Sequence, residues 1–383
     1  MLYKDWIKRW FLFIFFIPFL VIVNYLVDPY EIYMNDFFNL EKTKQAKKIR
    51  LSKIEHIKII KPKVLVMGTS RVENGFDPKH KYFEDSGYNF GLSGASMYEI
   101  SKSFEFIVNQ IQPKKVLLVL DWIMFNSYNQ VRVKDFNEYF NKDFNKYKYL
   151  ISSDMTGESF VTILDNFKNK KSSYLDNGQL KHDSKANDIL KHGGQKNVMI
   201  KEEAFYYKKY TVQNNYGDTK RDAFLDFEDL LNFAFSKDIQ LEIIFGPSHI
   251  RQWEAFSYYH DYNLLLNWKK KVVLTVDRLS HKYNKKSFNI VDFSIYNKYT
   301  SEKIPSKKEE LMKYYWEGSH YRNSLGQLVL DFLYGDIYDK ELGVVLTKKN
   351  IDEHLKKLLL DRKKYIDSKE YKFKINGYLK LLK

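Results

Sequence analysis

The sequence of 383 residues contains no cysteine, which excludes disulfide bonds and thiolate metal sites. It also lacks a Walker loop, a Gly-x-Gly-x-x-Gly dinucleotide signature, a His pair with metalloprotease spacing and the Gly-x-Ser-x-Gly elbow of the α/β-hydrolases. No zinc-finger spacing or compact recognition motif indicates nucleic-acid binding. These absences favour a protein that works without a metal or a cofactor and that does not bind nucleic acid.

The formal charge of +15 is unevenly distributed, because positions 347–383 hold twelve Lys and Arg against five Asp and Glu. Such a basic exterior suits anionic lipid headgroups or an anionic glycan. The aromatic content of 17% argues against a largely disordered chain, since disordered segments are depleted in aromatic residues. The length allows one main domain that carries a sizeable insertion.

An apolar run near the N-terminus predicts a membrane anchor over residues 1–30. Between Trp10 and Val27 the only clearly polar residue is Asn24, and eighteen helical residues span about 27 Å. Lys4, Lys8 and Arg9 precede the run, so we expect the N-terminus in the cytoplasm and the rest of the chain outside the inner membrane. A cleaved signal peptide is the alternative, but no small-x-small cleavage site follows.

The next segment, residues 31–61, is predicted to be a juxtamembrane helix. Apolar residues recur about every third position in its second half, at Ile49, Leu51, Ile54, Ile57 and Ile60.

Residues 62–335 are predicted to form a three-layer α/β sandwich with a parallel, flavodoxin-like sheet and a functional site at the carboxyl ends of its strands. Short apolar runs that predict strands alternate with longer helical stretches. The predicted strands are 64–67, 88–90, 116–120, 241–245 and 289–293, and the predicted helices are 97–111, 221–235, 262–283 and 324–334. Residues 126–218 show little periodicity and are expected to be an insertion that caps the site, while residues 336–383 are expected to be a basic helical tail.

Two short motifs carry the chemistry. The first strand breaks into Gly68-Thr69-Ser70-Arg71, and the far end of the domain contains Glu317-Gly318-Ser319-His320. A Ser after a parallel strand presents its hydroxyl at the sheet edge, where His320 would take its proton and Glu317 would orient the imidazole. The simpler interpretations are helix caps, for the Gly-Thr-Ser tripeptide and for Glu317 alike. The two motifs together favour a serine hydrolase or acyltransferase.

The two motifs resemble those of the SGNH (GDSL-like) hydrolase superfamily, in particular its membrane-anchored branch that includes the alginate O-acetylation proteins and the teichoic-acid D-alanylation protein. The resemblance covers roughly residues 62–335 and implies a catalytic Ser70, His320 and Glu317, where Glu317 departs from the usual Asp. It also implies that Gly91 is an oxyanion donor, with Gly94 as a near competitor.

Other positions are weaker candidates within the same resemblance. The usual third block, Gly-x-Asn-Asp, is absent, and the run that replaces it contains Asp121 and Asn126. Asn126 is a second oxyanion candidate, and it also suits a loop cap. Asp121, Arg71 and His249 are candidates for substrate binding, although a structural salt bridge explains Arg71 equally well.

The two motifs predict a serine acyltransferase or esterase, and the apolar run places it outside the cytoplasm. The resemblance implies that it acts on acyl groups, most simply O-acetyl groups, of a cell-surface or secreted polysaccharide. The resemblance implies a multispanning acyltransferase as the partner that supplies the acyl group. One alternative is a catalytically inactive glycan-binding or assembly protein of the same fold. Another is a membrane-surface protein whose basic tail binds anionic lipid.

Overall fold

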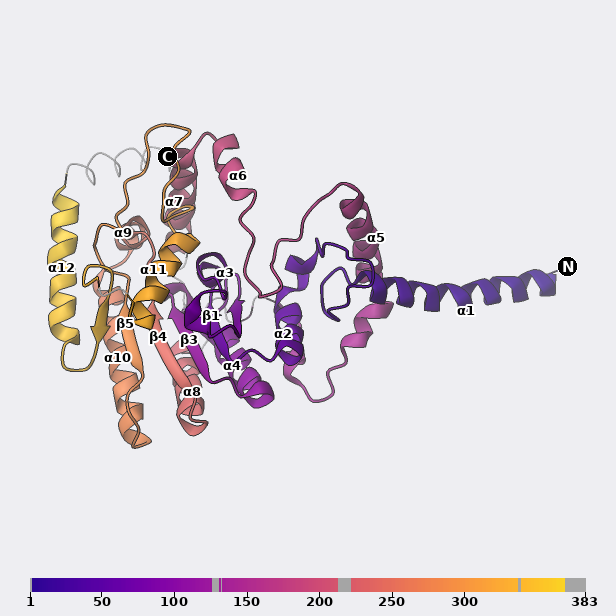
Figure 1. The fold of residues 1–383 in the computed structure, drawn as a ribbon, viewed down its shortest axis with the longest axis horizontal. Coiled ribbons are helices and arrows are strands. Elements are labelled where there is room, and N and C mark those ends of the chain that lie inside the picture. The colour runs from indigo at the N-terminus through magenta and orange to yellow at the C-terminus, as the bar shows by residue number, and fades with distance from the viewer. Residues whose placement is uncertain (1, 126–130, 132, 213–221, 337–338, 369–383) are drawn as a thin grey trace. The chain divides into compact units, whose positions relative to one another are not determined.

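The computed structural model describes residues 2–125, 131, 133–212, 222–336 and 339–368 (Figure 1). The chain divides into two compact units, one made of Met1–Lys61 and Val133–Lys181 and the other of Pro62–Arg132 and His182–Lys383. The predicted boundaries differ from this division. The insertion expected at 126–218 is shared between the two units, and the segment after residue 335 belongs to the second unit.

The first unit is helical. Its elements are α1 (Leu2–Val27), η1 (Gln45–Lys48), α2 (Ile49–Ile60), η5 (Phe136–Phe140), η6 (Lys146–Ile151) and α5 (Ser153–Phe167). The N-terminal helix is therefore present, but none of the helices that the structure describes combines the length and the apolar character needed to cross a membrane. The crossing predicted from the sequence is not supported by the structure.

The juxtamembrane helix is shorter than the predicted range 31–61 and coincides with the part of it that carries the apolar repeat. The α-helix α2 begins at Ile49, after one 3₁₀ turn, and ends at Ile60. Its apolar residues Leu51, Ile54 and Ile57 are fully buried, whereas Ile60 at the last turn is exposed. The apolar repeat thus marks the buried face correctly over most of the helix.

The second unit is built on a six-stranded, mostly parallel sheet flanked by helices. The strand order is β2-β1-β3-β4-β5-β6, and the strands are β1 (Val64–Gly68), β2 (Gly87–Gly91), β3 (Lys115–Leu120), β4 (Gln240–Phe245), β5 (Asn289–Asp292) and β6 (Val344–Leu346). The five predicted strands are all present and parallel. The antiparallel β6 was not predicted, because three residues give too short a pattern.

Helices cover both faces of this sheet. One layer consists of α4 (Met97–Ile111), α8 (Ala223–Ser236), α10 (Asn263–Lys282) and α12 (Ile351–Asp367), which pack in that order. On the other face, α3 (Ser70–Gly75) packs against α11 (Asn323–Tyr334), over a core that includes alternate residues of the strands, such as Val64 and Val66. The remaining elements are η2 (Lys81–Phe83), η3 (Trp122–Phe125), α6 (Lys185–Lys191), α7 (Gln195–Val212) and α9 (Ile250–Tyr259). The predicted α/β class, with a mostly parallel sheet flanked by helices, is confirmed. The flavodoxin-like, SGNH-type assignment stays a prediction.

Two glycines bring α3 and α11 into backbone contact. A Cβ atom on Gly326 of α11 would lie 1.6 Å from the carbonyl oxygen of Gly75 in α3, and a Cβ on Gly75 would lie 2.0 Å from the ring of Tyr321. A larger side chain at Gly326 would require a shift of the backbone, and one at Gly75 would require the buried Tyr321 ring to move. This contact holds the helix that begins at Ser70 against the segment that follows His320.

Buried charged groups tie the predicted tail to the sheet. The carboxylate of Asp292, at the end of β5, accepts hydrogen bonds from Lys269 Nζ at 2.7 Å and from His354 Nε2 on α12 at 2.8 Å. Arg362, also on α12, forms an ion pair of 2.9 Å with Glu254. The predicted helix in the tail is present, but it is an integral part of the second unit rather than a peripheral appendage.

Candidate active site

The nucleophile candidate lies at the carboxyl edge of the sheet. Strand β1 ends at Gly68, Thr69 caps the following helix, and Ser70 is the first residue of α3. The Thr69 hydroxyl accepts a hydrogen bond from the Arg71 N–H at 3.3 Å and donates one to Asp121 at 2.5 Å. The sharp turn at Thr69 therefore leaves the Ser70 side chain, which is half-buried, at the end of the strand.

The structure brings the three predicted catalytic residues together. Ser70 Oγ lies 2.8 Å from Nε2 of His320, although the two residues are 250 positions apart in the chain. The other ring nitrogen of His320, Nδ1, contacts a carboxylate oxygen of Glu317. This is the order of hydroxyl, imidazole and carboxylate that a Ser–His–acid relay needs.

Glu317 occupies the acid position although its side chain is one methylene longer than that of Asp. Its carboxylate also accepts hydrogen bonds from the backbone N–H groups of Ser319 at 2.7 Å and His320 at 3.0 Å. The loop thus folds back on the carboxylate, which accommodates the longer side chain. Burial by itself raises the pKa of the Glu317 carboxyl, but His320, the Ser319 N–H and Lys185 lower it to about 2.

The lowered pKa of Glu317 predicts a pH-dependent contribution to stability. Because its pKa is about 2 in the folded chain against an ordinary value of 4.5, this contribution is complete above pH 4.5 and is lost as the pH falls toward 2. Urea unfolding followed by tryptophan fluorescence measures it. We expect Glu317→Gln to be less stable than the parent at pH 7, and the difference to shrink at pH 3.5.

The matched control for this prediction is Glu105→Gln, whose carboxylate forms an exposed ion pair with Lys102. Exposed pairs contribute little, so the control is expected to change the free energy of unfolding by less than about 1 kcal/mol at both pH values. A Glu317→Gln difference that stays constant or grows between pH 7 and pH 3.5 would contradict the assignment.

Arg71 and Asp121 are positioned inside the protein, not in contact with solvent. Arg71 Nη1 lies 3.1 Å from the Asp121 carboxylate, and both side chains are about nine-tenths buried or more. Arg71 Nε also donates to the carbonyl oxygen of Ser319 at 3.0 Å. This pair therefore connects three loops of the site, those that carry Ser70, Asp121 and His320, and the substrate contact predicted for either residue has no support in this geometry.

The two oxyanion candidates have different outcomes. Gly91 ends β2, and its N–H donates to the side-chain oxygen of Asn89 at 2.9 Å. A Cβ on Gly91 would lie 2.6 Å from the backbone nitrogen of Glu73, so this glycine allows α3 to approach β2. Its role as an oxyanion donor stays a prediction. Asn126, the other candidate, lies outside the described residues.

His249 is placed as a helix cap. Its Nδ1 accepts a hydrogen bond from the Arg251 N–H at 3.3 Å at the start of α9, and its Nε2 lies 3.0 Å from the carbonyl oxygen of Glu302. The residue is 2% exposed. With both ring nitrogens engaged, His249 serves local structure in this arrangement and does not line an open substrate entrance.

Two asparagines that sequence reasoning missed support the nucleophile loop. Asn74 Nδ2 donates to the carbonyl oxygen of Ser70 at 2.7 Å. Asn89 Nδ2 donates to the carbonyl oxygens of Val72 and Phe76, each at 2.8 Å. A buried Asn in the middle of a strand needs hydrogen-bond partners. A polar residue inside a predicted buried strand is therefore the signal in the sequence that could have identified Asn89.

The segment from His182 to Val212 covers the catalytic loop. Gln195, at the start of α7, donates to the carbonyl oxygen of Trp316 at 2.7 Å and accepts from the N–H of Met312 at 3.2 Å. Lys185 on α6 donates to Asn74, and Tyr206 on α7 hydrogen-bonds the side chain of Ser319. These contacts come from the last part of the predicted insertion, and the capping role predicted for residues 126–218 stays a prediction.

Lys185 brings a cation close to the acid of the relay. Burial lowers the pKa of its ammonium group to about 8, and the nearby carboxylates of Glu317 and Glu73 oppose that shift. Its Nζ also lies 5.6 Å from the centre of the Trp316 ring. Lys185 thus adds positive charge beside Glu317, which contributes to the low pKa of that carboxyl.

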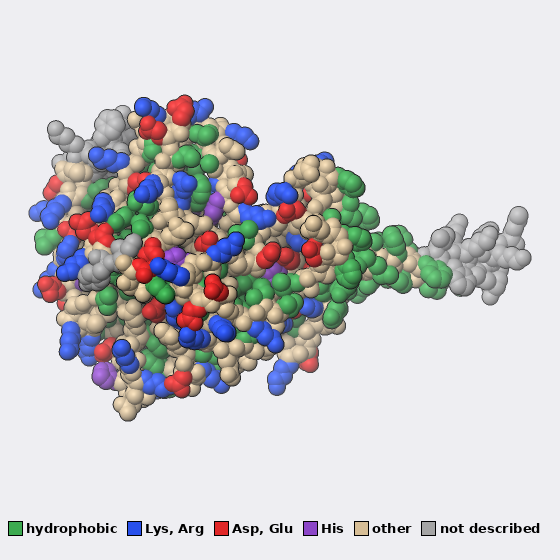
Figure 2. Space-filling model, in the orientation of Figure 1, with side chains coloured by type: hydrophobic (Ala, Val, Ile, Leu, Met, Phe, Trp, Pro, Cys, Tyr) green, Lys and Arg blue, Asp and Glu red, His purple; other side chains and the backbone are tan. Residues whose placement is uncertain are grey.

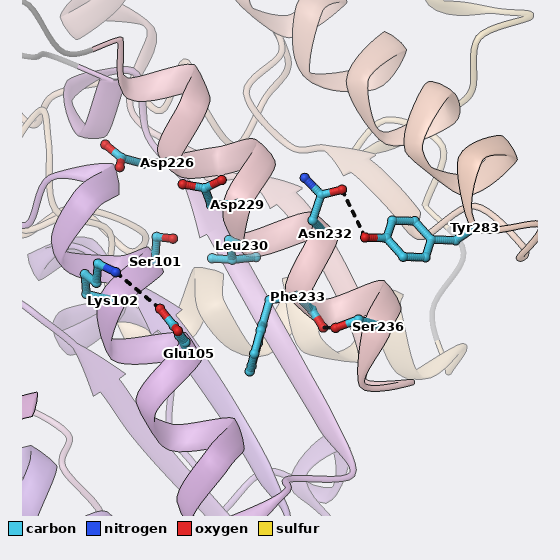
Figure 3. A pocket seen from close by; sticks show the side chains of 10 residues that line it. All are labelled: Ser101, Lys102, Glu105, Asp226, Asp229, Leu230, Asn232, Phe233, Ser236 and Tyr283. Carbon is cyan, nitrogen blue, oxygen red and sulfur yellow. Dashed lines mark hydrogen bonds and ion pairs between the residues drawn. The ribbon is translucent and has the colours of Figure 1, made fainter. Parts of the chain in front are cut away.

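A separate pocket of about 330 Å³ lies on the flank of the sheet (Figure 3). Its walls come mainly from α4 and α8, with Tyr283 after α10. The lining residues are Ser101, Lys102, Glu105, Asp226, Asp229, Leu230, Asn232, Phe233, Ser236 and Tyr283. Lys102 pairs with Glu105, and the Tyr283 hydroxyl donates to Asn232. None of the catalytic candidates lines this pocket, so we place the candidate active site at the Ser70 loop instead.

Comparisons with protein-family models, with curated proteins and with solved structures find no match to this chain. The resemblance to the SGNH superfamily therefore depends on the two short motifs and on the arrangement of Ser70, Glu317 and His320. Membership of that superfamily stays a prediction.

Proposed function

We propose that this protein is a serine acyltransferase or esterase that acts on O-acyl groups, most simply O-acetyl groups, of a polysaccharide of the cell envelope. The observation that carries the proposal is the 2.8 Å contact between Ser70 Oγ and His320 Nε2, with Glu317 on the opposite ring nitrogen. The choice of polysaccharide and of acetyl is supported by the motif resemblance alone.

The first half of the reaction forms an acyl-enzyme. Ser70 Oγ attacks the ester carbonyl carbon while its proton passes to Nε2 of His320, and the negative Glu317 stabilises the imidazolium that results. The tetrahedral intermediate then expels the alcohol, which takes the proton back from His320. The acyl group is left as an ester on Ser70, and the imidazole is neutral again.

The second half decides between transfer and hydrolysis. A sugar hydroxyl, or water, gives its proton to His320 and attacks the acyl carbon, and Ser70 leaves with that proton. Transfer requires that water be kept away from the acyl-enzyme.

We also propose that the catalytic unit acts outside the cytoplasmic membrane and receives its acyl group from a multispanning acyltransferase. The basic residues Lys4, Lys8 and Arg9 before the apolar run support the orientation. The donor partner is supported only by the motif resemblance.

Labelling with a fluorophosphonate probe tests the catalytic proposal. We expect the parent protein to be labelled, because the probe reacts with an activated serine, and Ser70→Ala to be unlabelled. Ser287→Ala is the matched control, since Ser287 is exposed on the loop before β5 and should not affect labelling.

Two outcomes would contradict the proposal. Undiminished labelling of Ser70→Ala would place the nucleophile elsewhere. A folded parent protein that neither reacts with the probe nor turns over acetyl esters would favour the catalytically inactive glycan-binding protein.

A further inference from the structure

The outward face of α5 in the first unit is apolar. The side chains of Phe160, Val161, Leu164 and Phe167 are 39–81% exposed, and their spacing of one, three and three residues places them on one face of the helix. A surface helix of a soluble protein normally turns its apolar face inward. This helix does the reverse over its last two turns.

The polar side chains of α5 point inward instead. Asp165 is 3% exposed and forms ion pairs with Lys44 and Lys170, each at 2.7 Å. Ser159 is fully buried, and its hydroxyl donates to the side-chain oxygen of Asn24 on α1 at 2.9 Å. The polar groups of α5 are paired inside the unit and its apolar groups face outward. This arrangement is favourable when the outer face contacts a medium less polar than water.

The same inversion continues onto α1, which packs against α5. Asn24, the one clearly polar residue of the apolar run, is fully buried and donates to the carbonyl oxygen of Leu150 and to Thr156. By contrast, four successive residues, 14–17, are 45–69% exposed. Successive residues point in different directions around a helix, so α1 presents apolar side chains all round at residues 14–17. In Figure 2 hydrophobic side chains gather over the coloured part of α1 and the part of the first unit next to it.

We propose that α5 lies in the plane of a lipid bilayer and inserts this apolar face, which we name the α5 face (Phe160, Val161, Leu164, Phe167), into the acyl-chain region beside α1. The all-round exposure of α1 favours lipid over a protein groove, because a groove would cover one side only. Lys168 follows the α5 face directly, where its charge suits anionic headgroups at the level of the interface. Lys170 and Lys171, close behind it, form ion pairs with Asp165 and Glu41.

This contact is independent of the Ser70 chemistry. It would attach the first unit to lipid together with α1, and it does not require α1 to cross the bilayer. A single helix leaves the attached unit free to rotate above the membrane. A second apolar element, joined to α1 through Asn24 and Ser159, fixes the orientation of the first unit relative to the bilayer.

The absence of cysteine makes a direct test available. Leu164→Cys in the full chain can be labelled with the fluorophore NBD, and the protein reconstituted into vesicles of phosphatidylglycerol and phosphatidylethanolamine. We expect a blue shift, a rise in emission of about two-fold or more, and quenching by lipids that carry a nitroxide on the acyl chain. Leu360→Cys on α12, exposed at 62%, is the matched control and should show neither change.

Three results would overturn the proposal. The first is a label at position 164 that responds no more than the label at 360 in vesicle-bound protein. The second is quenching only by nitroxides on the headgroup. The third is a blue shift that appears without lipid at high protein concentration, which would indicate that a second copy of the chain covers the α5 face. Acetyl-ester turnover by the Leu164→Cys protein, measured in parallel, keeps this result separate from the catalytic proposal.

Discussion

Replacing His320 with asparagine is expected to lower kcat for ester turnover by about 10⁴- to 10⁶-fold, with little change in KM. Nε2 of the imidazole lies 2.8 Å from Ser70 Oγ, where it can take the hydroxyl proton. Without it, Ser70 attacks as a neutral hydroxyl. Glu317→Gln is expected to cost less, about 10⁴-fold, because the imidazole remains but loses the charge that orients it.

Steady-state kinetics with an acetyl ester checks this expectation, with circular dichroism to confirm that each variant is folded. The matched control is His281→Asn, since the side chain of His281 is 76% exposed on α10. The double variant Ser70→Ala/His320→Asn should be no slower than either single variant, because residues that act as one unit are not additive. Activity of His320→Asn within ten-fold of the parent would remove His320 from the mechanism.

Arg71→Met is expected to lower the free energy of unfolding by about 3–5 kcal/mol, the usual cost of breaking a buried ion pair. The substitution leaves the Asp121 carboxylate buried beside the Thr69 hydroxyl and removes the donor to the carbonyl oxygen of Ser319. Burial disfavours the charged guanidinium, but Asp121 raises the pKa of Arg71 above its ordinary value. Urea unfolding measures the effect.

Two further variants separate the free energy lost by leaving one charge unpaired from the net stabilisation that the ion pair provides. Arg71→Met/Asp121→Leu should recover part of the lost stability, because no charge is then left unpaired. Arg278→Met, which removes an exposed pair with Glu228, should cost less than about 1 kcal/mol. A loss in Arg71→Met no larger than in Arg278→Met would show that Arg71 does not brace the site.

The sequence predicted the parts of this protein that local patterns determine. Short apolar runs marked the five parallel strands, and the carboxyl edge that they share explains why Ser70 and His320 meet across 250 positions. The acid position was also predictable, since the loop that holds Glu317 contains only four residues from acid to base.

Features that depend on distant partners could not be predicted from the sequence. Whether Arg71 meets substrate or Asp121 depends on a contact across 50 positions, and the capping role of His249 depends on the geometry of a turn. The cover over the site was expected, but no local pattern in residues 126–218 showed that Lys185 and Gln195 would supply its contacts while residues 133–181 joined the N-terminal helices.

The pairing of Asp292 with His354 and Lys269 has a consequence for dividing this chain into fragments. A fragment that stops at residue 335, where the superfamily resemblance ends, would lose both β6 and α12. It would expose the open edge of β5 and leave Asp292 with one of these two hydrogen-bond partners. A fragment intended for crystals or for assays of the hydrolase-like unit should therefore continue through Asp367. The last helix packs on that unit and hydrogen-bonds its sheet, as an integral layer element does.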